Sequence, residues 1–267
     1  MGTYDAILPA GATLDEEFAR EAGVTSKALI EIGGQTVLER TLRALQASGV
    51  VGRTVVIGAE DVRSHPAAGL ATVTVEPGNS GPENIYRGLS ALASQGDAPK
   101  RVLVVTTDLP FLKPEMIREF VERCPEDGHF CVPLVAQAAF HERFPGTSAT
   151  FVALKDGVWT TGCVYLIDAE ALRLARPHIE RVFENRKSKF GMARLLGPVF
   201  VFKWLTKSLT VTDVEAKIKS LLGCTGRAIA DSPPEFSFDI DYPEDYRYAM
   251  ANARRFATAG PAEGVKV

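Results

Sequence analysis

Cysteine is scarce in this sequence, and the four cysteines present form no recognisable site. Cys124, Cys131, Cys163 and Cys224 include no CxxC pair, and no histidine lies at a zinc-ligand spacing from them. A structural zinc site or a disulfide framework is therefore not indicated. We expect four buried thiols in a reducing cytoplasm.

An excess of charge of either sign is also absent. The 267 residues carry 30 Lys and Arg against 33 Asp and Glu, which gives a formal net charge of −3. This balance indicates no general affinity for nucleic acid or for an anionic membrane. Any phosphate binding would therefore have to come from local groups.

Long hydrophobic runs are missing as well. No apolar stretch approaches the length of a membrane span, and the first residues lack the basic region and long apolar run of a signal peptide. We expect a cytoplasmic protein with neither a membrane nor a nucleic acid as its partner. There is also no GxSxG motif and no Cys–His pairing, so a covalent nucleophile is not indicated.

The first half of the chain contains a regular alternation of strand and helix patterns. Short β-branched runs predict strands at 4–8, 53–58, 71–77 and 101–108, and amphipathic stretches predict helices at 36–49, 82–96 and 113–124. This alternation implies right-handed βαβ crossovers. It predicts an α/β fold with three layers, α/β/α, around a mainly parallel mixed sheet. Ligands of such sheets bind beyond the carboxyl ends of the strands.

The second half of the chain is less regular. Strand patterns cover 129–135 and 148–168, with a hairpin turn at 155–157, and a last strand is expected at 236–240. Helical pieces cover 169–223 with interruptions at Pro177 and Pro198, a capping box pairs Thr212 with Glu215, and a last helix begins at Pro243. We expect one domain over 1–257, with an acceptor-binding region at about 136–225 and a flexible tail at 258–267.

Two segments that follow predicted strands carry residues suited to nucleotide chemistry. Small residues follow the first strand at 8–12, where backbone N–H groups can approach phosphates, and Lys27 lies beyond them. A tight turn with a surface lysine is the alternative. Asp108 ends the strand at 101–108, where a carboxylate can hold Mg²⁺ or cap a loop, and both interpretations stay open.

A third segment, DIDYPED at 239–245, contains two aspartates spaced two apart. Asp239 and Asp241 would share one face if the strand at 236–240 continued through them. Glu244 and Asp245 would lie in the first turn of the last helix, where their charge suits the helix dipole. Asp241 is therefore the functional candidate of this segment, and the role of Asp239 is undecided.

Together these segments resemble a known family. AILPAGA at 6–12, SKALIEIGGQTVLERTLRAL at 26–45, VLVVTTDLPFL at 102–112 and DIDYPEDY at 239–246 look like the nucleotidyltransferase family that includes molybdenum-cofactor guanylyltransferase-like proteins. The resemblance runs from about residue 4 to about residue 256. It implies a Rossmann-like α/β/α sandwich with a GT-A-like fold, and an Mg²⁺-dependent enzyme. Such an enzyme would transfer NMP from an NTP to a small, phosphorylated acceptor and release pyrophosphate.

The resemblance also implies roles for individual residues. Lys27, Asp108 and Asp241 would be the catalytic residues, with Asp108 and Asp241 as the Mg²⁺ ligands. The nucleotide would contact Leu8, Pro9, Ala10, Gly11, Ala12, Lys27, Gly78, Asn79, Asn84 and Asp108. For Gly78, Asn79 and Asn84 an ordinary loop followed by a helix N-terminus is the alternative. Base preference cannot be read from these residues.

Three further residues are candidates for binding the acceptor. Thr161 and Gly162 belong to TTGCVYLID, which resembles the family strand before the acceptor region. Lys187 lies in a basic cluster with Arg186 and Lys189, and a phosphorylated acceptor would need such charge. A solvated helix face is the commoner meaning of such a run. Molybdopterin, a sugar phosphate and a polyol phosphate all remain possible acceptors, and a monomer or a homo-oligomer is equally open.

The loop at 12–26 departs from the family pattern. A short glycine-rich turn and an arginine usually precede the lysine, whereas ATLDEEFAREAGVTS is longer and acidic in its first half. Arg20 would replace the missing arginine only if this loop folded back over the site. Two alternative functions therefore stay open: a GT-A-type glycosyltransferase that uses a nucleotide-sugar, and a non-catalytic nucleotide-binding module.

Overall fold

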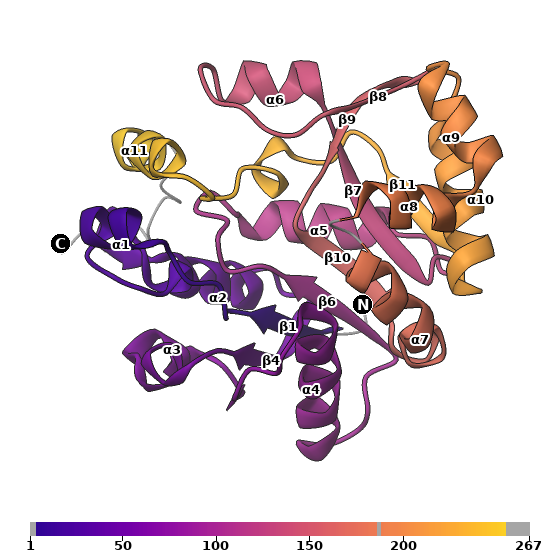
Figure 1. Cartoon of the computed structure of the whole chain (residues 1–267). Helices are drawn as coiled ribbons and strands as arrows, with labels where there is room; N and C mark the ends of the chain where they lie inside the picture. Colours follow the sequence, from indigo (N-terminus) through magenta and orange to yellow (C-terminus); the bar gives the residue numbers. More distant parts are fainter. Residues whose placement is uncertain (1–3, 186–187, 255–267) are drawn as a thin grey trace, which may run out of the picture.

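A mixed nine-stranded sheet forms the centre of the computed structural model, which describes residues 4–185 and 188–254 (Figure 1). The strands follow the order β5-β4-β1-β6-β10-β7-β9-β8, and β11 pairs with β7. Their bounds are β1 Tyr4–Pro9, β4 Val51–Ile57, β5 Val73–Val75, β6 Arg101–Val105, β7 Phe130–Ala136, β8 Val152–Leu154, β9 Gly157–Thr161, β10 Val164–Asp168 and β11 Gly226–Ile229. A separate two-stranded sheet joins β2 Glu31–Ile32 to β3 Gln35–Thr36.

Helices connect these strands and cover the sheet. They are α1 Glu16–Ala22, α2 Val37–Ala47, α3 Glu60–Ser64, α4 Gly81–Ser94, α5 Pro114–Arg123, α6 Gln137–Arg143, α7 Ala169–Asn185, α8 Lys189–Leu196, α9 Pro198–Leu205, α10 Val211–Leu222 and α11 Pro243–Asn252. Short 3₁₀ turns occupy η1 Lys27–Leu29, η2 Pro66–Leu70 and η3 Pro234–Phe236. Within the described residues no helix is both long and apolar enough to cross a lipid bilayer.

Alternate residues of the central strands face opposite helical layers. Leu8 of β1 and Leu103 of β6 pack in the core that includes Leu42 of α2 and Phe120 of α5. Their sequence neighbours Ile7 and Val104 face the other layer, which contains Leu89 of α4 and Leu172 of α7. Because both faces are covered, these strands are apolar without alternation, as their sequences predict. The α/β/α sandwich predicted from the sequence is confirmed.

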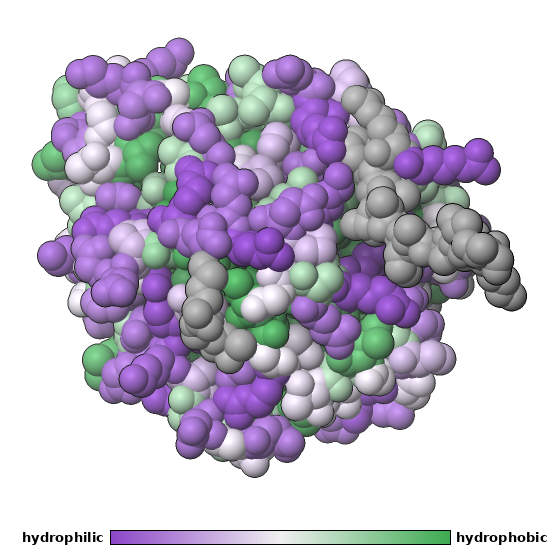
Figure 2. Space-filling view, turned by 180° about the vertical axis from the view of Figure 1, so that it is seen from behind, coloured by the Kyte–Doolittle hydropathy of each residue, from purple (hydrophilic) through white to green (hydrophobic). Residues whose placement is uncertain are grey.

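Parallel pairing is confined to part of the sheet. The strands β5, β4, β1 and β6 pair in parallel, and β7 and β11 do so as well. β10 is antiparallel to both β6 and β7, and β9 is antiparallel to β7 and β8. The hairpin predicted at 155–157 joins β8 to β9. Seen from behind, the surface is mainly hydrophilic, with hydrophobic residues in separate patches (Figure 2).

Two predictions in the second half, a strand at 236–240 and a helix interruption at Pro177, are wrong. Residues 236–240 form no strand, because Pro233 and Pro234 lead into the turn η3 and the following chain meets its neighbours only at isolated hydrogen bonds. Pro177 does not interrupt a helix but lies inside α7, which is anchored by the buried Leu172 and Ala175. The tail predicted at 258–267 lies outside the described residues.

The capping box of α10 lies two residues earlier than predicted. Thr210 accepts the backbone N–H of Asp213, and the Asp213 carboxylate accepts the backbone N–H of Thr210 in return. Glu215, the predicted partner of Thr212, instead accepts the backbone N–H of Ala228 at 2.8 Å and so ties α10 to β11. The division into one domain with an acceptor region at 136–225 stays a prediction.

Candidate active site

A cavity of about 280 Å³ opens where the loops after β1, β5 and β6 meet. Its lining consists of Pro9, Gly11, Ala12, Lys27, Pro77, Gly78, Asn84, Thr106, Thr107 and Asp108. Seven of these ten were predicted nucleotide-binding residues. The Thr107 hydroxyl donates to the Pro9 carbonyl at 3.2 Å and so holds the first and third loops together. The cavity therefore lies at the carboxyl ends of parallel strands, where ligands of such sheets bind.

The first loop contributes only part of the stretch predicted to wrap the nucleotide. Pro9, Gly11 and Ala12 line the cavity. Leu8 and Ala10 are 0% and 2% exposed and belong to the core packed against α2 and α5. Alternation explains why Leu8 and Ala10 face the core while Pro9 and Gly11 face the cavity. Ala12 lies beyond the end of β1, where alternation no longer applies. Leu8 and Ala10 therefore support the loop, and their side chains do not reach the cavity.

The long loop at 12–26 leaves the cavity and returns to it. Thr13 and Ser26 form an isolated antiparallel bridge, and the backbone N–H of Lys27 donates to the Ala12 carbonyl at 3.0 Å. Between them the chain forms α1, which lies beside α11 (Figure 1). The insertion is thus closed at its base, and Lys27 stays next to the small residues of the first loop.

Helix α1 docks away from the cavity. Phe18 is 1% exposed and its ring lies 5.9 Å from that of Tyr246. Glu21 accepts two hydrogen bonds from Arg247, at 2.7 and 2.6 Å. Arg20 is exposed, and its Nε donates to the Glu16 carbonyl within the same helix. Arg20 therefore does not stand in for the arginine that usually precedes the lysine.

Lys27 lies between two of the predicted aspartates. Its Nζ donates to Asp108 Oδ2 at 2.9 Å and also to Asp241 Oδ1. Burial alone would lower the pKa of Lys27, but the charges and hydrogen bonds of Asp108 and Asp241 outweigh burial and raise that pKa above the ordinary value for lysine. Lys27 is thus a buried cation held by two carboxylates.

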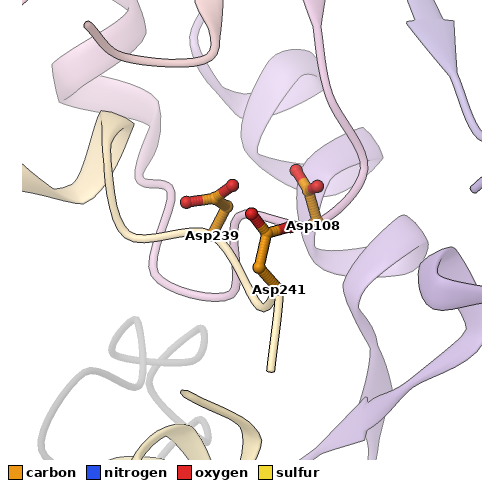
Figure 3. Close-up of side chains that lie close together, drawn as sticks. All are labelled: Asp108, Asp239 and Asp241. Carbon is orange, nitrogen blue, oxygen red and sulfur yellow. The ribbon is translucent and has the colours of Figure 1, made fainter. Parts of the chain in front are cut away.

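Asp239, which the sequence leaves undecided, completes a cluster of three carboxylates (Figure 3). One oxygen each of Asp108, Asp239 and Asp241 lies within 4.8 Å of the others. Burial raises the pKa of Asp239 to about 7, and the negative charges of Asp108 and Asp241 add to the increase. The Asp-x-Asp spacing at 239–241 is the signal that marks Asp239, although the residues form no strand.

A strap formed by residues 236–241 brings the two aspartates to Asp108. The backbone N–H of Cys163 donates to the Phe236 carbonyl at 2.7 Å, and that of Ile240 donates to the Asp108 carbonyl at 3.0 Å. At its end, Asp245 accepts the backbone N–H groups of Asp241 and Tyr242, at 3.1 and 2.9 Å. Asp245 thus fixes the backbone of Asp241, beyond the helix-dipole role that its position suggests.

The predicted base-facing segment is only partly in place. Gly78 and Asn84 line the cavity, and the Asn84 side chain accepts the backbone N–H of Gly78 at 2.6 Å. Asn79 is exposed and is not part of the lining; its backbone N–H is held by Glu83 at 2.7 Å. Pro77, which sequence reasoning missed, lines the cavity opposite Gly11.

The two predicted acceptor residues that the structure describes, Thr161 and Gly162, do not line the cavity. Thr161 is exposed and lies outside the lining, whereas Gly162 is buried beneath the strap. A Cβ at Gly162 would lie 2.7 Å from the Cβ of Phe236 and 2.9 Å from its carbonyl oxygen. Gly162 is thus a packing position that lets the strap approach β10. Lys187 lies outside the described residues.

The donor set suits a hard divalent cation. With Asp239 ionised, three carboxylates against one ammonium would leave two negative charges, and a bound cation would favour that ionised form. Carboxylate oxygens are the ligands that Mg²⁺ prefers. Asp108 Oδ1 is buried and has no hydrogen-bond partner among the described residues. A cation at this cluster would satisfy that oxygen and balance the charge. Asp108, Asp239 and Asp241 are therefore the residues that fit a metal ion.

Comparison with known proteins agrees with the fold and with the class of enzyme. The family model of the MobA-like NTP transferase domain matches residues 17–194. A bifunctional IPC transferase and DIPP synthase of Rubrobacter xylanophilus is 33% identical over 97% of this chain and 54% of its own. A 2-C-methyl-D-erythritol 4-phosphate cytidylyltransferase of Corynebacterium jeikeium is 32% identical over 37% of this chain and 42% of its own.

A solved structure extends this likeness. The structure of a hypothetical transferase from Thermus thermophilus is 32% identical, has a TM-score of 0.81, and covers 91% of this chain and 99% of its own. The chain spans about half the length of the curated relatives it matches. The matched family and the shared fold confirm the resemblance drawn from the three motifs. The chain belongs to the family of MobA-like NTP transferase domains.

Proposed function

We propose that this chain is an Mg²⁺-dependent cytidylyltransferase that transfers CMP from CTP to a small polyol phosphate and releases pyrophosphate. The cluster of Asp108, Asp239 and Asp241 beside the cavity, with Lys27 paired to the first and the last of them, carries the proposal. The Corynebacterium relative is a cytidylyltransferase for a polyol phosphate, which supports both the base and the class of acceptor. The match to a transferase along almost the whole chain supports the same class of reaction.

In the proposed reaction an oxygen of the acceptor phosphate attacks the α-phosphorus of CTP. A new bond forms between that oxygen and the α-phosphorus, the bond from the α-phosphorus to the β-bridging oxygen breaks, and pyrophosphate leaves with the electron pair. A phosphate oxygen is already anionic, so the attack needs no general base. The one carboxylate in the cavity lining, Asp108, is therefore free to serve as a metal ligand in the proposal.

The residues at the cavity would divide this work. Asp108, Asp239 and Asp241 would hold Mg²⁺, which when bound supplies Lewis-acid stabilisation of phosphate charge. Lys27 would exchange its carboxylate contacts for oxygens of the departing pyrophosphate. The backbone of Gly11 and Ala12 would lie along the triphosphate, since neither residue has a side chain that obstructs it. Catalysis would thus rest on positioning and charge. We place the reaction in the cytoplasm, where the four cysteines would stay free.

Pyrophosphate release tests the proposal. The chain is incubated with Mg²⁺, each of the four NTPs and either a polyol phosphate or the same polyol without its phosphate. We expect release with CTP and the phosphorylated acceptor, and a nucleoside diphosphate-linked product of matching mass. Pyrophosphate release with another NTP instead of CTP would contradict the proposed preference for cytosine. The absence of release with every NTP and a panel of sugar and polyol phosphates would contradict the function.

A further inference from the structure

The helix α9 buries none of its residues, although it is one of the most apolar segments of the chain. Six of its eight residues are Val, Phe, Trp or Leu. Val199, Phe202 and Leu205 are 72%, 66% and 67% exposed, and their spacing of three places them along one side of the helix. A helix that is apolar on most sides normally packs into a core or a membrane.

The preceding helix and the end of α9 add two large aromatic side chains. Phe190 of α8 is 83% exposed and Trp204 of α9 is 55% exposed. We call Phe190, Val199, Phe202, Trp204 and Leu205 the α8–α9 surface. Its helices lie on the side of the molecule opposite α1 and α3 (Figure 1), and none of its residues lines the cavity.

The charge of this segment differs from that of the whole chain. Residues 185–212 contain six basic residues and no Asp or Glu, whereas the chain as a whole has a net charge of −3. Lys203 pairs with Asp213 at 2.7 Å. Arg194 and Lys207 make no salt bridge with any residue that the structure describes. Of the nearby acids, Asp156 is occupied in accepting the backbone N–H of Val211.

We propose that the α8–α9 surface docks on an anionic lipid bilayer. Exposed aromatic and aliphatic side chains on helices flanked by Lys and Arg are the features of interfacial membrane-binding helices. The apolar side chains would enter the head-group region, and Arg194 and Lys207 would contact lipid phosphates. The net charge of the whole chain predicts no affinity for an anionic membrane. Residues 185–212, however, carry only basic charge, and the excess of acidic residues lies in the rest of the chain. The field of the protein would therefore orient this face toward the lipid.

A second copy of the chain is a less suitable occupant. A two-fold dimer through this surface would place one basic segment against the same basic segment. Like charges facing each other would oppose association, whereas phosphate head groups would neutralise them. The charge pattern thus favours an anionic bilayer over self-association.

Vesicle co-sedimentation of the full chain tests the proposal. Vesicles of phosphatidylcholine alone are compared with vesicles that also contain phosphatidylglycerol. We expect sedimentation with the anionic vesicles only, and its loss on adding salt. Trp204 is one of two tryptophans, so its emission should shift to the blue on binding, and Trp204→Phe should abolish that shift.

Paired variants separate the surface from the fold. Phe202→Ser with Leu205→Ser should abolish sedimentation, while Leu174→Ser, which replaces a 73% exposed residue of α7, should leave it unchanged. Arg194→Gln and Lys207→Asn should each weaken vesicle affinity about five-fold, because each removes one basic charge near the surface. Lys100→Gln, elsewhere on the molecule, is the matched control. Pyrophosphate release in solution should be the same in all of these variants.

Two results would overturn the proposal. One is the absence of binding to anionic vesicles, or equal binding to neutral ones. The other is a concentration-dependent dimer that Phe202→Ser with Leu205→Ser disrupts, which would make the surface an interface between copies. Neither result bears on nucleotide transfer, which is measured separately.

Discussion

The backbone N–H of Ile240 donates to the backbone carbonyl of Asp108 at 3.0 Å. This bond joins the loop after β6 to the strap at 236–241. Its donor, Ile240, stands between Asp239 and Asp241 in the sequence. Backbone pairing therefore holds the three carboxylates close together, although their negative charges repel one another. A bound cation would reduce that electrostatic repulsion.

Removal of any one carboxylate should abolish transfer and leave the fold intact. We expect Asp108→Asn, Asp239→Asn and Asp241→Asn each to lower the rate of pyrophosphate release at least about 100-fold, the scale seen when one stabilising group is removed from an active site. Steady-state kinetics at saturating Mg²⁺ measure this. Glu244→Gln, which changes a 76% exposed side chain of the same segment, is the control. A near-native rate for Asp239→Asn would remove that residue from the site.

Removal of the Lys27 ammonium group should lower the stability of the fold, and a bound metal ion should restore it. Lys27→Met leaves three carboxylates without their buried cation, and we expect unfolding to be easier by about 1–3 kcal/mol, because one partner is partly solvated. Thermal unfolding with and without Mg²⁺ measures this, with the exposed Lys100→Met as control. Mg²⁺ should stabilise Lys27→Met more than the native chain. An equal gain would mean that Lys27 and the metal do not share the cluster.

A methyl group at Gly162 should displace the strap. Gly162→Ala would bring its Cβ against the backbone of Phe236, a contact that cannot be relieved by a flexible side chain. We expect a loss of about 1–3 kcal/mol in stability, together with a fall in kcat at temperatures where the variant is folded. Gly146→Ala is the contrasting variant. Gly146 has a positive φ, so alanine is strained there, but no atom lies near the added Cβ. A destabilised Gly162→Ala variant with native kcat would show that the strap tolerates movement.

The insertion should contribute to stability more than to nucleotide binding. Phe18→Ala empties a position that is 1% exposed among aromatic neighbours, and we expect a cost of about 3–5 kcal/mol. The base of the insertion is closed independently by the bridge from Thr13 to Ser26, so Lys27 should keep its place. Nucleotide affinity of the folded variant, measured by titration at low temperature, should therefore be close to native. A large loss of affinity would make α1 part of the nucleotide site.

The sequence predicts much of the parallel half of the sheet, because apolar runs and helix periodicity are local signals. The sequence also predicts that Asp108 and Lys27 belong to the site. Asp108 ends a predicted strand, and Lys27 lies beyond the small residues that follow the first strand. The meeting of Asp239 with Asp108 is a tertiary event, and only the Asp-x-Asp spacing hints at it. The predicted strand at 236–240 failed because the alternating apolar residues Phe236, Phe238 and Ile240 suit a strap packed on the core as well as a strand.

The side chains of the first loop show another limit of sequence reasoning. The motif marks the whole stretch from Leu8 to Ala12, but the side chains of Leu8 and Ala10 pack in the core and only the other three residues line the cavity. Thr161 and Asn79 lie outside the cavity lining for a similar reason, since family position does not say where a side chain points. Arg20 could be placed only by the structure, because the length of the insertion leaves its path open.

Two alternatives drawn from the sequence lead to different products. A glycosyltransferase would consume a nucleotide-sugar and release a nucleotide without forming pyrophosphate. A non-catalytic module would bind NTP and release nothing. Pyrophosphate release with a polyol phosphate therefore separates both from the proposed cytidylyltransferase.

Thermal unfolding with CTP, with and without Mg²⁺, tests the central claim most directly. At a ligand concentration about 100 times Kd, binding should add about 2.7 kcal/mol to the stability of the chain. We predict a rise in Tm of about 5–10 °C that needs Mg²⁺. It should be absent in Asp108→Asn and present in Glu244→Gln. A rise that is the same without Mg²⁺, or that survives Asp108→Asn, would contradict a metal-assisted nucleotide site at Asp108, Asp239 and Asp241.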